Sequence, residues 1–415
     1  MRQWSKVIPV AIAFSFGNAW ATDGYFFHGY GVRSQGVGGV GIALPQDALA
    51  AATNPAGMGK VGDRVDAGVT WFRPVRESEI EGSGAPGANG TYKGNDSQNF
   101  FIPELGYNKQ YSEDVTLGVS VYGNGGMNTD YKNGIPLLNS NGRPTGVDLA
   151  QVFVAPTVTW KVQEHNTLGV SLNLAYQRFE AKGLQNFSNA SSSSANLTNN
   201  GHDDSYGAGV HIGWLGEITD TVSLGATYQS RTYMSRFDKY KGLFAEQGDF
   251  DIPSTYGVGV AVKVTPALTL AADFQRINYS EVDSVGNASL SNLNNGLGND
   301  NGAGFHWQDA KVYKIGALYQ YSPELILRAG YNHVDQPIRS GDTLFNLLAP
   351  GVVKDHLSIG ATWVLSPQSE VSFAYTHAFE NTVRGQNSIP ASFGGGDANV
   401  RMYQDALGVA YTWKL

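Results

Sequence analysis

Side chains that could carry catalytic or metal chemistry are present in this sequence, but they lack the spacing that such chemistry needs. The chain has no cysteine, which excludes disulfides, thiolate catalysis and cysteine-based metal sites together. Its eight histidines are scattered without metal-ligand spacing. The G-x-S-x-G elbow, the H-E-x-x-H zinc motif and the phosphate-binding P-loop are absent. The sequence therefore predicts a protein that is not an enzyme and that uses neither cofactor nor metal.

Three short matches to binding motifs lack the surroundings that would make them functional. The pattern G-x-G-x-x-G at 36–41 is that of a dinucleotide fingerprint, but it does not stand between a buried strand and a helix. Asp249 with Asp251, and the run 299–301, carry oxygen ligands of the kind that Ca²⁺ prefers. Neither completes an EF-hand pattern. We expect both to be polar residues of solvated loops.

The first residues have the features of a cleavable export signal. Arg2 and Lys6 supply positive charge, and an apolar core of about ten residues follows. Residues 19–21 read A-W-A, the small-x-small form of a cleavage site. A membrane anchor would need about 20 apolar residues, more than this core contains. We expect 1–21 to be a signal peptide and the mature chain to start at Thr22.

The charge and hydrophobicity of the remaining chain exclude two further classes of protein. Removing Arg2 and Lys6 from the 28 basic residues leaves 26 against 36 acidic residues, a net charge of −10 instead of −8. An acidic chain without basic patches argues against a nucleic-acid partner. No long apolar run follows the signal, which excludes a helical inner-membrane protein.

From residue 64 onward, stretches of about ten residues alternate between apolar and polar side chains. Successive side chains of a β-strand point to opposite faces, so each stretch predicts a strand with one face of each kind. In an outer-membrane barrel the apolar face meets lipid and the small polar face lines the lumen. In the last stretch Leu407, Val409, Tyr411, Trp413 and Leu415 share one face, and Ala406, Gly408, Ala410, Thr412 and Lys414 share the other.

The connections between these stretches alternate strictly between very short turns and long Gly/Asn/Ser-rich loops. Transmembrane barrels show this alternation because turns face the periplasm and loops face outward, whereas a soluble two-sheet protein has no reason for it. We therefore predict an all-β fold, a transmembrane antiparallel β-barrel of about fourteen strands over 64–415. The expected strands are 64–76, 99–110, 115–128, 149–162, 167–181, 205–216, 221–235, 252–264, 268–280, 311–321, 325–336, 354–365, 369–380 and 401–415.

A barrel of this size has a lumen too wide to stay dry unless something occupies it. Residues 22–63 precede the first strand, show no strand alternation and are longer than a periplasmic lead-in requires. We interpret them as an N-terminal plug (hatch) inside the lumen, with a short helix over 43–52. A disordered periplasmic tail is the alternative.

Strand parity also turns several charged side chains toward the lumen. Facing lipid at mid-bilayer, a lysine or arginine would cost up to about 2–4 kcal/mol. In the lumen each charge could pair across the barrel or hold the plug, and binding of an anionic head group by a cluster of them stays open. These residues are Glu104, Lys161, Lys263, Asp273, Lys314, Arg328 and Lys414.

Several runs of the chain resemble FadL-type outer-membrane transporters, which carry long-chain fatty acids and, in a toluene-related branch, aromatic hydrocarbons. The most specific element is Asn54-Pro55-Ala56-Gly57, which resembles the plug motif of that family. The strand count and the plug length agree with the family over the whole mature chain. The other similar runs are 36–41, 47–48, 102–107, 118–123 and 127–131.

The resemblance implies passive uptake of hydrophobic small molecules such as long-chain fatty acids or hydrocarbons. Cargo would bind an apolar pocket beside the plug, pass when the plug rearranges, and leave sideways into the bilayer at a kink in the third strand. Glycines inside a strand mark bulges and bends. Our candidates for the kink are therefore Gly123, Asn124, Gly125 and Gly126. A strand end running into its loop is the alternative.

The resemblance also suggests where the ligand binds. The extreme N-terminus lines the pocket in this family, which makes Tyr25, Phe26 and Phe27 candidate ligand-binding residues. Leu243 and Phe244, in an outer loop, are candidates for a landing site, although such a pair often only anchors a loop. The opening of the mature chain differs from the fatty-acid type, so the cargo, fatty acid or hydrocarbon, stays undecided.

Two other functions compete with uptake of hydrophobic molecules. One is a general diffusion porin for polar solutes, and the other is an outer-membrane lipid hydrolase. For the favoured function we expect a monomer in the bacterial outer membrane, surrounded by lipid and lipopolysaccharide and binding a hydrophobic small molecule but no nucleic acid.

Overall fold

The computed structural model describes residues 23–289 and 293–415, so the expected signal peptide and Thr22 lie outside the described residues. The described chain forms one antiparallel sheet of sixteen strands. Two of them, β2 (Gly90–Lys93) and β9 (Tyr233–Met234), only flank β1 and β7, which leaves fourteen in the ring. The ring consists of β1 (Arg64–Glu81), β3 (Phe100–Gln110), β4 (Val115–Tyr131), β5 (Thr145–Gln163), β6 (Asn166–Lys182), β7 (Asp203–Thr219), β8 (Val222–Gln229), β10 (Thr255–Lys263), β11 (Leu268–Ile277), β12 (Ala310–Ser322), β13 (Leu325–Val334), β14 (Asp355–Ser366), β15 (Ser369–Val383) and β16 (Asp397–Lys414).

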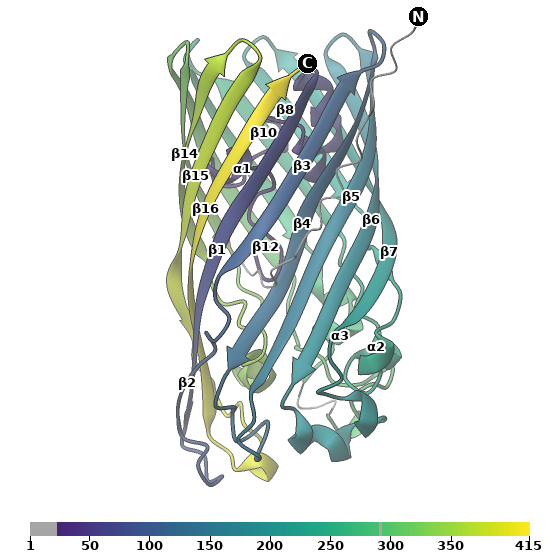
Figure 1. Ribbon diagram of the computed structural model, residues 1–415, viewed down its shortest axis with the longest axis vertical. Coiled ribbons are helices and arrows are strands. Elements are labelled where there is room, and N and C mark those ends of the chain that lie inside the picture. Colours follow the sequence, from purple (N-terminus) through teal and green to yellow (C-terminus); the bar gives the residue numbers. More distant parts are fainter. Residues whose placement is uncertain (1–22, 290–292) are drawn as a thin grey trace, which may run out of the picture.

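The ring closes because the first and last strands pair along their whole length, from Arg64↔Lys414 to Glu81↔Asp397. Short turns and the C-terminus lie at one end of the barrel and the long loops at the other (Figure 1). The predicted all-β, fourteen-stranded antiparallel barrel is confirmed. Closure leaves no free sheet edge along β1 and β16. A sheet that crosses a membrane requires this, because an open edge would expose unpaired N–H and C=O groups to lipid.

The two faces of the strands differ as the alternation predicted. In β16, Leu407 and Trp413 are about half exposed on the outside, whereas Ala406 and Thr412 are buried on the inside. The outer apolar residues meet lipid rather than a protein core. None of the described helices is long and apolar enough to cross a membrane.

The helices are all short and lie either in the lumen or in the outer loops. The lumen contains α1 (Val32–Gln35) and the 3-10 turns η1 (Ala50–Ala52) and η2 (Pro55–Lys60). The outer loops contain η3 (Gln185–Ala190), η4 (Ser194–Asn196), η5 (Asp238–Tyr240), α2 (Ala245–Gly248), η6 (Tyr279–Glu281), α3 (Asp283–Gly286), η7 (Leu293–Asn295), η8 (Ser340–Asp342), α4 (Thr343–Asn346) and η9 (Ala391–Phe393).

Residues 23–63 lie inside the ring of strands, where α1 is visible in Figure 1. Inward-facing glycines make room for this lumen segment, since a Cβ on them would overlap its backbone or side chains. Gly169 of β6 faces Ala56, and Gly330 of β13 faces Val37. The small inner face of the strands therefore fits the segment. Other wall glycines in the same situation are Gly106, Gly213, Gly225, Gly259, Gly316, Gly360 and Gly408.

The predicted helix over 43–52 is wrong except for its last turn, η1. Two carboxylates of the barrel wall bind backbone N–H groups just before and within this stretch. Asp273 of β11 accepts from the Ile42 N–H at 3.0 Å, and Asp66 of β1 accepts from the Ala48 N–H at 2.9 Å. The Ala48 N–H is therefore not free to bond the carbonyl of Leu44, as a helix would require.

Strand boundaries differ from the prediction mainly at the outer ends. β1 continues to Glu81 because its outer half pairs with β16 and β2. β8 ends at Gln229 rather than 235, and the chain then returns to pair with β7 as β9. Outside the membrane the alternation of side chains weakens, so sequence periodicity no longer marks where pairing stops.

We predict that Gly330→Ala dislodges the lumen segment, because the added methyl group overlaps the backbone of Val37. Overpacking of this kind costs about 1–3 kcal/mol. The variant should show higher ion conductance in planar bilayers and a lower unfolding temperature. Gly341→Ala is the control, since nothing lies within 4 Å of the Cβ position there. Equal conductance of Gly330→Ala and wild type would contradict this packing role.

Candidate functional site

Two inward-facing carboxylates hold the lumen segment by its backbone. Glu104 of β3 accepts from the Val32 N–H at 2.8 Å, where α1 begins. Asp273 accepts from the N–H groups of Gly41 and Ile42 at 2.8 and 3.0 Å. Both carboxylates are buried. The two carboxyl groups accept from backbone N–H groups of different parts of the segment, so they anchor it at two separate points.

Two inward-facing cations, on the neighbouring strands β12 and β13, hold the same segment. Lys314 of β12 donates to the carbonyl of His28 at 2.8 Å, and Arg328 of β13 donates to the Gln46 side chain at 2.6 Å. Four of the seven charges predicted in the lumen therefore contact the segment. The other three lie near the periplasmic rim and are at most half-buried: Lys161, Lys263 and Lys414.

The Asn54-Pro55-Ala56-Gly57 run forms the start of η2 and fastens it to the wall. Asn54 caps the turn by accepting from the Ala56 N–H at 3.1 Å, and Pro55 occupies the first position, where no N–H is needed. The Asn54 amide also donates to the carbonyls of Ile42 at 2.7 Å and Trp214 at 3.0 Å. One side chain thus joins two parts of the segment to β7.

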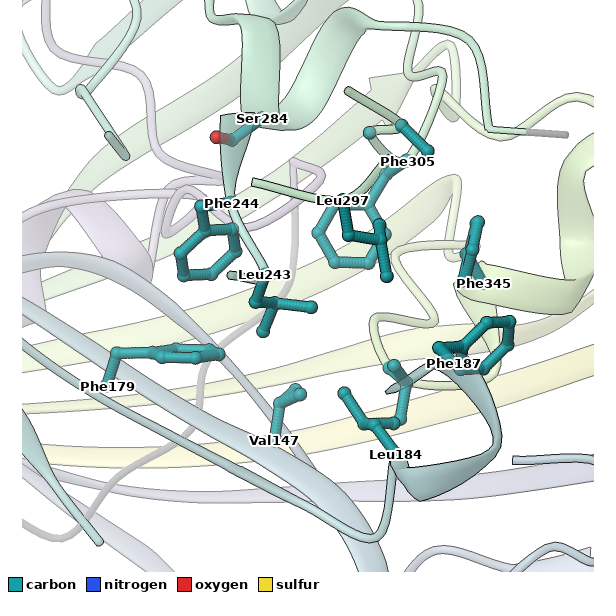
Figure 2. Close-up of a pocket in the computed structure, with 13 residues that line it drawn as sticks. Val147, Phe179, Leu184, Phe187, Leu243, Phe244, Ser284, Leu297, Phe305 and Phe345 are labelled. Atoms are coloured by element: carbon teal, nitrogen blue, oxygen red, sulfur yellow. The ribbon is translucent and has the colours of Figure 1, made fainter. Parts of the chain in front are cut away.

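An apolar pocket lies on the outer-loop side of the lumen, and Leu243 and Phe244 are part of its lining (Figure 2). Figure 2 shows Leu243 and Phe179 facing the same space from a loop and from β6. The cavity measures about 40 Å³, room for only a few water molecules. A hydrocarbon would therefore have to push the rings apart. The remaining lining residues are Val147, Leu184, Phe187, Ser284, Leu297, Ala303, Gly304, Phe305, Phe345 and Leu348.

Aromatic rings connect this pocket to the first described residues of the chain. Phe244 packs on Phe250 with ring centroids 4.8 Å apart, and Phe250 packs on Tyr25 at 6.0 Å. Tyr25 in turn contacts Phe26 at 5.4 Å and Trp307 at 5.8 Å. A continuous apolar path thus runs from the loops down to the N-terminal arm, the name we use for residues 23–30.

One hydroxyl group, that of Tyr279, binds the backbone of the first residues of the N-terminal arm. Tyr279 donates to the carbonyl of Asp23 and accepts from the N–H groups of Tyr25 at 3.2 Å and Phe26 at 3.3 Å. Burial raises the pKa of both tyrosines well above the ordinary value, and the carboxylates of Asp251 and Glu281 raise the pKa of Tyr25 further. The hydroxyl groups therefore stay neutral.

The three aromatic residues predicted to bind ligand separate in the structure. Tyr25 and Phe26 belong to the large apolar cluster that includes the pocket. Phe27 turns the other way and packs on Phe72 of β1, with ring centroids 6.0 Å apart, in a separate cluster. Gly24 and Tyr25 form a turn closed by the bond from the Asp23 N–H to the Phe26 carbonyl at 3.0 Å, so the chain changes direction there and Phe27 leaves the pocket side.

The ladder between β3 and β4 is incomplete. It runs from Gln110↔Thr116 only to Leu105↔Val121. Beyond that point Phe100–Glu104 forms a ladder with β1 but not with β4, and β4 forms a ladder with β5 but not with β3. We call this interruption, between Phe100–Glu104 and residues 122–129, the lateral gap.

The run Gly123, Asn124, Gly125 and Gly126 lies at the lateral gap. The register with β5 shifts between Gly123 and Gly125, so Asn124 is the extra residue of a bulge. All four residues are buried, which breaks the alternation of β4. β4 continues to Tyr131, so the alternative that the strand ends here is wrong.

The N-terminal arm covers the lateral gap from the inside. Phe26 forms an isolated β-bridge with Gly125. The Phe27 N–H donates to the carbonyl of Asn124 at 3.1 Å, and the Gly126 N–H donates to the carbonyl of Tyr25 at 2.9 Å. The arm thus supplies some of the backbone hydrogen bonds to β4 that β3 does not make there. The fold thus brings together two sets of predicted residues from distant parts of the sequence.

Asp249 and Asp251 turn to an arginine rather than to open solvent. Arg231 Nε lies 2.6 Å from Asp251 and its guanidinium 3.7 Å from Asp249. The expectation of solvated loop residues is therefore wrong for this pair, because a cation already balances the two carboxylates. Among the described residues no cluster of three or more metal-type side chains is found.

Sequence reasoning missed most of the pocket. Phe179 could have been found, because it occupies an inward position of β6 where the pattern calls for a small or polar residue. Phe153 and Tyr122 break the pattern in the same way. The loop residues Phe187, Phe250, Trp307 and Phe345 have no such signal, since a loop has no fixed period.

A family model described as "Outer membrane protein transport protein (OMPP1/FadL/TodX)" matches residues 28–414 of this chain. The chain belongs to this family. The resemblance found in the sequence is thus confirmed, and the family places the barrel in the bacterial outer membrane. Members of the family are transport proteins by description.

Solved structures share the fold of this family member at low sequence identity. The Pseudomonas putida toluene transporter TodX is 18% identical, with a TM-score of 0.71 over 94% of this chain and 99% of that one. A Pseudomonas aeruginosa FadL homologue is 15% identical, with a TM-score of 0.72 over the same shares. A curated outer-membrane protein of Neisseria meningitidis serogroup B is 21% identical over 98% of both chains.

We predict that Tyr279→Phe loosens the N-terminal arm. The substitution removes one donor and one acceptor and leaves two buried N–H groups and a carbonyl without partners, at about 1–3 kcal/mol for each unsatisfied group. Hydrogen exchange of a peptide covering 23–30 should become faster. Tyr240→Phe is the matched control, because its hydroxyl group bonds Gly201 in the outer loops. Unchanged exchange in Tyr279→Phe would show that other contacts hold the arm.

Proposed function

We propose that this protein takes up uncharged hydrophobic molecules, of the size and chemistry of hydrocarbons, passively across the outer membrane. The observation that carries the proposal is the lining of the pocket, which consists of apolar side chains, one glycine and Ser284, with no charged residue. Each buried CH₂ group of a ligand would gain about 0.8 kcal/mol there. A water-filled pore offers such a molecule no attraction.

The same lining favours a neutral hydrocarbon over a long-chain fatty acid. A carboxylate in an apolar site needs a cation or several hydrogen-bond donors to replace its water. The nearby Arg231 is already bound to Asp249 and Asp251. Two of the family's solved structures are named as toluene transporters, of P. putida and Ralstonia pickettii. We extend that chemistry to this chain as part of the proposal.

The proposed route leads from the pocket through the lateral gap into the bilayer. Cargo would move along the rings of Phe244, Phe250 and Tyr25 to the N-terminal arm. Displacement of the arm from β4 would then open the gap toward lipid. An apolar molecule would stay in apolar surroundings throughout and avoid the aqueous periplasm. In this proposal the lumen segment is a plug, and the N-terminal arm is the part of it that moves.

A general diffusion porin is the alternative function, and the occupied lumen argues against it. Bonds from β3, β11, β12 and β13 hold the lumen segment across the section through which a porin would conduct. Wild-type protein should therefore show little steady conductance in a planar bilayer. A large steady conductance would favour the porin. We also propose a monomer in contact with outer-membrane lipid and lipopolysaccharide.

We predict that purified protein binds toluene and discriminates against benzoate, which has the same ring and carries a charge. Calorimetric titration at neutral pH measures both affinities. Leu243→Lys, which places a cation in the pocket lining, should reverse or reduce the discrimination, and Leu243→Met should preserve it. Equal binding of the two ligands by wild-type protein would refute the proposed cargo.

We predict that deletion of Asn124 slows hydrocarbon uptake. The deletion removes the extra residue at the register shift, so β4 can pair regularly with β5 and extend its pairing to β3. Asn124→Ala keeps the bulge and serves as the control. Uptake of radiolabelled toluene by cells making each variant measures the effect. If the deletion variant folds and transports as fast as the control, cargo does not leave through the gap.

A further inference from the structure

The lateral gap has an outer margin, toward the long loops, and an inner margin, toward the short turns, and the two are built differently. At the inner margin the β3–β4 ladder resumes at Leu105↔Val121. At the outer margin, residues 94–97 cross over from β2 to β4. They meet it around Asp130: Asn95 forms a parallel bridge with Asp130, with backbone bonds of 3.2 Å on either side, and the Ser97 hydroxyl donates to the Asp130 carboxylate at 2.8 Å. One bridge and one side-chain bond are a weak closure for a strand that lacks its neighbour.

Arg76 of β1 reinforces this closure from inside the barrel. Its guanidinium donates to the carbonyl of Asn128 at 3.0 Å and to the Asn128 side chain at 3.2 Å. It also donates to the carbonyl of Ser97 and to the side chain of Asn95 at 3.4 Å. One side chain thus ties β1, the crossing segment and β4 together.

The position of Arg76 is unusual for a charged residue. It is only 1% exposed, and its hydrogen bonds go to neutral oxygens. A buried guanidinium is costly unless its donors are satisfied, and here one set of acceptors belongs to β4 and the other to the crossing segment. Separation of the two would leave the donors that face one of them without partners. Arg76 therefore opposes widening of the lateral gap at its outer end.

The same stretch of β4 also contacts the loop that lines the pocket. Thr129 donates to the carbonyl of Leu348 at 2.9 Å, and Tyr131 donates to the carbonyl of Leu347 at 2.7 Å. Leu348 is part of the pocket lining. Asn128, the main partner of Arg76, directly precedes Thr129. We call the bonds of Arg76 across the outer margin the latch. The latch and the pocket wall thus contact the same segment of β4, residues 128–131.

We propose that Arg76 is a positioning residue that sets the width of the lateral gap and so limits the size of the cargo that leaves through it. The inference deepens the proposed lateral exit and rests on it. Arginine suits the task because its planar, five-donor group can bond two chain segments at once, which a lysine ammonium does not reproduce. Loss of the latch should widen the gap without opening the barrel, since the inner margin stays paired.

The first test measures the width of the outer margin without reference to transport. The chain contains no cysteine, so spin labels can be placed on Lys93→Cys and Asn133→Cys, exposed positions on either side of the margin. Arg76→Met should lengthen and broaden the distance distribution between the labels, and Arg76→Lys should do so less. Arg73→Met is the matched control, because Arg73 faces outward from the same strand toward Asp405. An unchanged distribution in Arg76→Met overturns the latch.

The second test measures cargo size. Cells making each variant take up toluene and the bulkier phenanthrene, and the ratio of the two rates is compared. Arg76→Met should raise the phenanthrene-to-toluene ratio severalfold, with Arg76→Lys intermediate and Arg73→Met like wild type. Equal loss of both rates would mean that Arg76 only stabilises the fold and would refute the size limit. If wild type takes up neither compound, the proposed function fails, while the label distances still decide whether Arg76 is a latch.

Discussion

Backbone groups that face hydrocarbon must find their hydrogen-bond partners within the wall, because lipid offers none. The pairing of β1 with β16 over their full length meets this requirement by closing the sheet. The other main features follow from it. Alternation of side chains puts apolar residues against lipid, and closure of fourteen strands creates a lumen that must be filled. The interruption of the wall between β3 and β4 then needs a substitute partner.

The lumen is filled by the chain itself, and the inner face of the strands is complementary to the lumen segment in shape and in hydrogen bonding. Glycines at inward positions admit the backbone of the lumen segment, and buried charges satisfy its donors and acceptors. The segment therefore needs little regular structure of its own. Its short helical turns are consequences of where the wall holds it, which is why helix propensity over 43–52 was a poor guide.

At the lateral gap the substitute partner is the N-terminal arm, which bonds β4 where β3 is missing. A covering held by a few bonds can be displaced, whereas a paired strand cannot without breaking the wall. The aromatic path ends at this same arm. The proposed transport uses this place, where the N-terminal arm rather than a neighbouring strand bonds the backbone of β4, and in our proposal Arg76 limits how far it opens.

The sequence alone determined the barrel, its strand number and the interior position of four charges, because a period of two and alternating loop lengths are local properties of the chain. It also pointed to Asn54, Gly125 and Tyr25 through glycine content, aromatic content and family resemblance. Only the tertiary structure decided that Phe27 leaves the pocket side, that Asp249 and Asp251 bind Arg231, and that Phe250 and Trp307 join the aromatic path. These outcomes depend on contacts between residues far apart in the chain, and no local pattern records which loop meets which strand across the lumen.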